Sequence, residues 1–155
     1  MSNQEIWRRK QRLDHLFDLV SSISGEDELT AHWARYLCIQ VSGFLENSIR
    51  IMYSEYAYNK SSPYIANYVD CQIGQFQNAK MEKIFELIRQ FSPEWEQELR
   101  TCIDDELKDS VDSIVANRHL IAHGQSVGLT LGRVNRYYIN IQKVISLMEK
   151  QCNLQ

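Results

Sequence analysis

Hydrophobic residues recur every three or four positions along most of the chain, which is the period of an amphipathic helix. No segment shows the alternation of apolar and polar residues that a half-buried strand requires. Short connections favour packing between successive helices, so we predict one all-α domain over residues 1–155, an antiparallel bundle of four to six helices. The pattern places helices over 4–23, 27–58, 64–74 and 79–91, a short one from 93, and two more over 103–123 and 130–151.

Glycine, proline and serine mark several boundaries. Ser92 and Pro93 supply an N-cap and a first helical residue, so a helix is expected to begin there. Gly25 and Gly124 are placed to end the helices that precede them. Gly43 interrupts a long helical pattern and costs helix propensity, so we expect a close packing contact at this position.

Composition and charge exclude some classes of protein. The 155 residues are 44% hydrophobic and 24% charged, as is usual for a globular protein, and no apolar run has the length of a membrane span. The first ten residues contain no apolar segment typical of a signal peptide, so we expect a cytoplasmic protein. The four cysteines are scattered singly, a distribution typical of free, buried cysteines in a reducing compartment.

The net charge of −3 means that any contact with nucleic acid must come from a local patch. Residues 94–112 contain eight carboxylates and would repel phosphates. A basic block near the N-terminus is either a solvated helix face or a patch that contacts phosphate. The basic residues of this block are Arg8, Arg9, Lys10 and Arg12.

An arginine interrupts the apolar face of the predicted helix 103–123. Apolar residues occupy this face with spacings of four and three, and Arg118 stands where a leucine would be expected. Arginine is seldom buried without a partner, and departures from a local pattern are frequent at functional sites. The other members of the face are Leu107, Val111, Ile114 and Ile121.

The segment around this arginine contains groups suited to RNA cleavage. His119 and His123 are four residues apart and share a helix face, while the long side chain of Arg118 can lean towards the second histidine. A histidine can transfer a proton near neutral pH, and an arginine can neutralise the extra charge of the phosphorane. A two-fold dimer that pairs two such segments would supply both an acid and a base.

Neighbouring residues suggest supporting contacts. Glu46 and Asn47 lie beside the apolar face of the helix 27–58 and are candidate partners for Arg118. Arg133 and Arg136 follow the motif loop and are either RNA contacts or solvated side chains. The histidine spacing also fits a helical metal pair, but no third ligand is evident nearby, so we expect neither a metal nor a cofactor. A structural interpretation, a buried ion-pair and capping cluster at the helix end, stays open.

The segment 118–123 resembles the motif of an arginine, four residues and a histidine that marks the HEPN superfamily. Residues 37–50, 81–85 and 113–124 look like the corresponding helices of its RiboL-PSP type. The similarity extends over roughly residues 27–148.

The resemblance implies a helical domain that forms a homodimer through the motif region. It also implies a metal-independent endoribonuclease of a toxin–antitoxin, abortive-infection or other defence or RNA-processing system, with RNA and an antitoxin or other protein as partners and no membrane. Arg118 and His123 would be the catalytic pair, with His119 between them and Asn117 beside the RNA. Gln125 stands where some HEPN toxins have a modified tyrosine, so that regulation is not expected. Other HEPN domains are non-catalytic modules that dimerise or bind nucleotides or proteins.

Overall fold

The computed structural model describes residues 3–23 and 27–153, and helices are the only regular secondary structure in these ranges. The all-α prediction is therefore confirmed. The described part contains seven helices, which correspond to the seven segments placed by the sequence pattern and exceed the four to six expected for the bundle. Ile103, in an extended conformation, and the N-cap Asp104 separate the fifth helix from the sixth. The helices are α1 (Gln4–Ser21), α2 (Asp27–Lys60), α3 (Pro63–Ile73), α4 (Met81–Phe91), α5 (Pro93–Cys102), α6 (Asp105–Ala122) and α7 (Leu131–Asn153).

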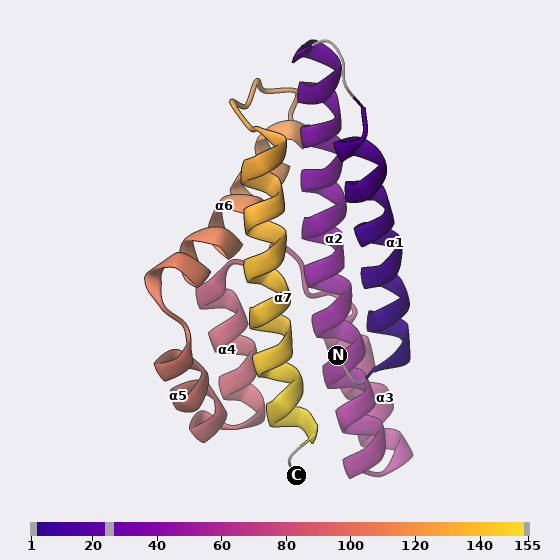
Figure 1. Ribbon diagram of the computed structural model, residues 1–155. Coiled ribbons are helices and arrows are strands. Elements are labelled where there is room, and N and C mark those ends of the chain that lie inside the picture. The colour runs from indigo at the N-terminus through magenta and orange to yellow at the C-terminus, as the bar shows by residue number, and fades with distance from the viewer. Residues whose placement is uncertain (1–2, 24–26, 154–155) are drawn as a thin grey trace.

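Two long helices, α2 and α7, form the centre of the bundle, with α1 and α6 beside them (Figure 1). The helices α1 and α6 run opposite to both, as predicted, but α2 and α7 run in the same direction. Phe44 of α2 lies 5.9 Å from Tyr138 of α7 between ring centroids, and Glu55 shares a cavity with Cys152 further along both helices. The parallel pair arises because α6 returns the chain to the end of the bundle at which α2 begins.

The core extends along the whole bundle and buries one face of every long helix. Phe17 and Tyr138 stack with ring centroids 4.9 Å apart, and the Tyr138 hydroxyl donates to Asp14 Oδ1 at 2.7 Å. A buried hydroxyl with such a partner avoids the cost of an unmade hydrogen bond. Among the described residues, no helix is long and apolar enough to cross a membrane.

Some expectations from the sequence are corrected. A Cβ atom built on Gly43 would meet nothing within 4 Å, so this glycine is not a close packing point. Cys38 is buried as expected, but Cys71 and Cys102 are exposed, because both lie on the outer faces of short helices. The helix end expected at Gly25 and the N-terminal residues 1–2 lie outside the described ranges.

Candidate functional site

The end of α6 is fixed by a glycine-based cap. Gly124 has a φ of 70°, and its N–H donates to the Ile121 carbonyl at 3.0 Å. The N–H of Gln125 donates to the Leu120 carbonyl at 2.9 Å. These two bonds form the Schellman motif, which a glycine in the left-handed region favours. The backbone of His123, the residue between helix and glycine, is therefore held in a defined conformation, as the sequence predicts.

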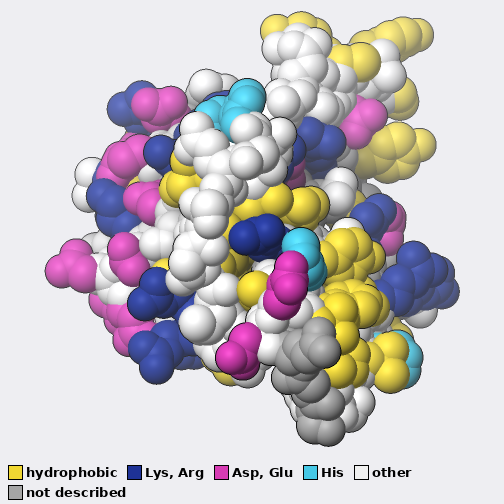
Figure 2. Space-filling view, turned by 90° about the horizontal axis from the view of Figure 1, so that it is seen from above, with side chains coloured by type: hydrophobic (Ala, Val, Ile, Leu, Met, Phe, Trp, Pro, Cys, Tyr) yellow, Lys and Arg dark blue, Asp and Glu magenta, His cyan; other side chains and the backbone are white. Residues whose placement is uncertain are grey.

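His119 and His123 lie together on this helix end. Their ring centroids are 4.4 Å apart with an interplanar angle of 61°, and both side chains are exposed. Figure 2 looks down on the end of the bundle that carries the α6–α7 loop, where histidine, basic and hydrophobic side chains reach the surface. The two imidazoles are thus accessible to a ligand in solution.

Arg118 is only half-buried, although the pattern places it on the apolar face, and Ile121, the last member of that face, is half-buried as well. Its Nη1 donates to Asn78 Oδ1 at 3.4 Å, and within the described ranges it has no ion pair and no hydrogen bond to His123. The charge and most of the N–H donors of the Arg118 guanidinium are therefore available to a ligand. A buried ion-pair cluster, the structural interpretation of this motif, is not formed among these residues.

Asn78 links Arg118 to α2. The backbone N–H of Asn78 donates to Glu46 Oε1 at 2.7 Å, while its side chain accepts from Arg118. Glu46 therefore supports Arg118 through an intermediate residue, not by direct contact. Asn78 has a φ of 55°, a conformation that asparagine tolerates better than most residues with a Cβ. The only signal in the sequence was an asparagine in a stretch without helical periodicity.

The irregular segment around Asn78 is held at several points. Arg50 donates from Nε and Nη2 to the Phe76 carbonyl at 3.1 and 2.6 Å. The N–H of Met81 donates to Asp112 Oδ1 at 2.7 Å, which ties the start of α4 to α6. Because these anchors come from both α2 and α6, Asn78 has a fixed position between the two helices.

The other predicted site residues form no hydrogen bond or ion pair with Arg118 among the described residues. The amides of Asn117 and Asn47 each donate to a carbonyl of their own helix, that of Ser113 and that of Gly43, both at 2.8 Å. Arg133 and Arg136 are exposed on the first turns of α7 and have no ion pair in the part of the chain that is described. The backbone of Arg133 is capped by Thr130 Oγ1 at 3.2 Å, which fixes the start of the helix.

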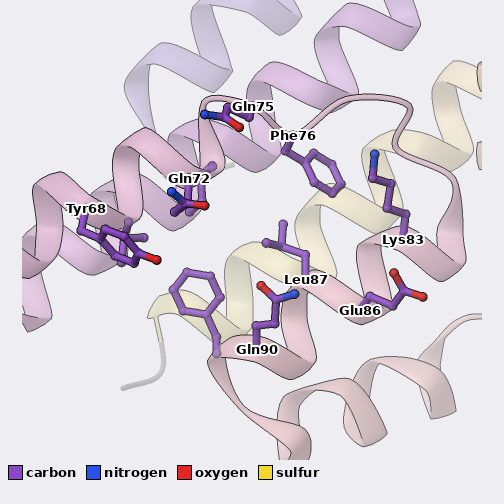
Figure 3. Close-up of a pocket in the computed structure, with 11 residues that line it drawn as sticks. Tyr68, Gln72, Gln75, Phe76, Lys83, Glu86, Leu87 and Gln90 are labelled. Atoms are coloured by element: carbon purple, nitrogen blue, oxygen red, sulfur yellow. The ribbon is translucent and has the colours of Figure 1, made fainter.

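A groove lies away from this helix end, between α3 and α4 (Figure 3). Its volume is about 560 Å³, and residues such as Tyr68 and Phe76 face Lys83, Glu86 and Gln90 across it. None of the site residues predicted from the sequence lines this groove. Within the described residues, no group of three or more His, Cys, Asp and Glu side chains is placed to hold a metal ion.

An all-α bundle with an arginine and a histidine five positions apart at a helix end is the arrangement expected for a HEPN domain. The family model described as RiboL-PSP-HEPN matches residues 4–154, almost the entire chain. The protein therefore belongs to the RiboL-PSP-HEPN family. No curated protein and no solved structure matches the chain.

Proposed function

We propose that this chain is a metal-independent endoribonuclease of the HEPN type. The observation that carries the proposal is the environment of Arg118. Asn78 holds its guanidinium, no opposing charge pairs with it among the described residues, and two exposed histidines lie at the same helix end. An unpaired, oriented guanidinium is suited to a phosphate, and an exposed imidazole is suited to proton transfer. Family membership adds independent support.

The proposed reaction needs no group beyond the RNA and these side chains. The ribose 2′-hydroxyl gives its proton to a base, and the 2′-oxygen attacks the adjacent phosphorus. The bond from phosphorus to the 5′-oxygen breaks, and an acid protonates the departing oxygen, which leaves a 2′,3′-cyclic phosphate and a 5′-hydroxyl. His123 acts as acid or base, His119 positions it or shares that role, and Arg118 neutralises the charge that develops on the phosphorane.

A homodimer through the motif region would complete this site. Two α6 ends related by a two-fold axis would supply the second histidine as the complementary acid or base. Asn117, Arg133 and Arg136 would contact the RNA on either side of the scissile bond. We place the activity in a toxin–antitoxin, abortive-infection or other defence or RNA-processing setting, with an antitoxin or other protein as regulator.

The test is cleavage of a mixed RNA substrate in EDTA by the native chain, Arg118→Ala and His123→Ala. The native chain should release 2′,3′-cyclic phosphate ends, detectable by mass spectrometry, and should leave a 2′-deoxy substrate intact. Each variant should lose at least about a hundredfold in rate, the usual contribution of such groups. His15→Ala is the matched control, since His15 is an exposed histidine on α1 and does not belong to the motif helix.

Circular dichroism and mass in solution should be the same for all four proteins. Intact RNA after incubation with the native chain, or equal cleavage by both motif variants, would overturn the nuclease proposal. A non-catalytic module that dimerises or binds a nucleotide or protein would then be the better description of this domain.

A further inference from the structure

A groove of about 330 Å³ lies between α1 and α2, apart from the motif residues. Its polar lining consists of two guanidinium groups, from Arg9 and Arg12, and two carboxamides, from Gln40 and Asn47, with no carboxylate. This lining is unusual in a chain whose net charge is −3. The volume is at the lower end of the range for small-ligand sites, about 300 to 1,000 Å³. The remaining lining residues are Leu13, Leu16, Ile39, Gly43 and Phe44.

Gly43 gives this groove its depth at the middle of α2. A Cβ atom at this position would meet nothing within 4 Å, so no neighbouring helix requires the glycine. A glycine in a helix interior costs about 0.5 to 1 kcal/mol relative to alanine. The residue therefore weakens the helix without improving its packing, and its effect is to expose the backbone to whatever enters the groove.

Several polar groups of the groove have donors or acceptors that are not used in hydrogen bonds to other described residues. Arg12 and Gln40 have no hydrogen bond or ion pair from their side chains to any other described residue. Arg9 pairs with Glu5 at 2.8 Å, but both side chains are well exposed, and such pairs contribute little. The Asn47 amide donates to the Gly43 carbonyl and keeps its oxygen available.

We propose that this groove binds one nucleotide unit of a single-stranded RNA. Arg12, assisted by Arg9, would hold the phosphate, the carboxamides of Gln40 and Asn47 would meet the edge of the base, and its face would lie on the apolar wall. The proposal deepens the proposed function, since the strand held here would be the substrate. On α2, Asn47 faces the groove while the adjacent Glu46 bonds to Asn78, the residue that holds Arg118.

The test measures affinity without cleavage. The probe is a short, fluorescent 2′-O-methyl RNA, which lacks the attacking hydroxyl and cannot be cut by the proposed reaction. Gly43→Leu fills the groove with a good helix former and should weaken binding about tenfold, the scale of one lost base contact. Arg12→Ala should weaken it by a similar factor and lower the slope of log affinity against log salt by about 0.7, the value for one phosphate on a single strand.

Two matched controls separate binding from folding. Gly43→Ala places a single methyl group in the groove, so it should weaken binding by less than Gly43→Leu while raising stability. Arg8→Ala removes an exposed arginine that belongs to the same basic block but does not line the groove, so it should change affinity by less than the Arg12 variant. Circular dichroism identifies any variant that fails to fold, and Arg12→Ala tests the site independently of Gly43.

Native affinity in both Gly43→Leu and Arg12→Ala would overturn the groove proposal, whether or not the native chain cleaves RNA. A change of mass in solution without a change of RNA affinity would instead assign the groove to a second copy of the chain. If the variants lose affinity but the native chain cuts no unmodified RNA, the nuclease proposal fails and the groove remains an RNA-binding site.

Discussion

The two halves of α6 are held by different means. In the first half, Asp104 caps the helix by accepting from the Leu107 N–H at 2.8 Å, and Val111 and Ile114 are completely buried. In the last turns Arg118 is only half-buried and His123 is exposed. Burial of one half therefore fixes the helix, so that the other half can present polar groups that add little to stability.

The two halves of α6 also differ in how the charges around them are paired. Near the first half, Glu82 accepts from Arg100 at 3.0 Å and from Lys108 at 3.2 Å, and these bonds, that of Arg100 above all, lower the pKa of the Glu82 carboxyl. The bases Arg100 and Lys108 are both paired there, whereas Asp105 and Asp109 have no ion pair among the described residues. Arg118 has no such ion pair among the described residues. If the chain binds RNA as proposed, a phosphate should therefore be attracted to the motif end and repelled by the acidic one.

The largest difference should appear in stability. Ile114→Ala removes a fully buried side chain from the packed half and should lower the free energy of unfolding by about 2 to 5 kcal/mol. His123→Ala, at the exposed end of the same helix, should change it by less than about 0.5 kcal/mol. Urea denaturation followed by circular dichroism measures both. Equal losses of unfolding free energy in the two variants would show that the packed and the exposed half of α6 contribute equally to stability.

Thiol reactivity should report on the packed half. Cys38 lies beneath it, with Sγ 3.6 Å from the Ile114 carbonyl oxygen, and burial raises the pKa of this thiol from 9.0 to about 12. Its thiolate fraction at pH 8 is then about a thousandfold below the usual value. With Ellman's reagent, the exposed Cys71 and Cys102 should react first and Cys38 only after unfolding. Burial also raises the pKa of the Cys152 thiol to about 12, so the Cys38→Ala variant should retain one slow thiol in place of two. Rapid labelling of all thiols would contradict the prediction.

A smaller effect is expected at the contact that holds Arg118. Asn78→Gly retains the left-handed backbone and the N–H that bonds to Glu46, but it removes the oxygen that accepts from Arg118. If the chain cleaves RNA as proposed, kcat should fall about tenfold with KM little changed, the scale of one hydrogen bond to a charged group. In an Arg118→Ala background the same substitution should have no further effect. A further tenfold loss of kcat in the Arg118→Ala background would mean that Asn78 does not act through Arg118.

The smallest effect concerns the cap that separates helix from loop. Gly124→Ala forces a residue with a Cβ to adopt a φ of 70°, which should cost about 1 kcal/mol of stability. Gly128→Ala is the control in the same loop, since a Cβ there would meet nothing within 4 Å and its backbone does not have a positive φ. Urea denaturation should show a loss of stability for Gly124→Ala and little change for Gly128→Ala. Equal stabilities of the two variants would show that the cap contributes nothing.

Periodicity predicted the helices and the motif end well, because both depend on local sequence. The helix end at Gly124 and the helix start at Pro93 lie where the sequence places them. Asn78 was not predicted, since its role depends on contacts with residues 32 and 40 positions away. The open space beside Gly43 was missed for the same reason: a glycine in a helix pattern indicates that something approaches, but not whether it is protein or ligand.

Both chain ends described here lie at the same end of the bundle, where the N–H of Asn3 donates to Glu149 Oε1 at 2.9 Å. The α6–α7 loop lies at the opposite end (Figure 1). The 23 residues of α7 span about 35 Å, so a tag or surface linker joined at either end sits roughly that far from the histidines. A chain immobilised by either end would therefore present its motif to the solution.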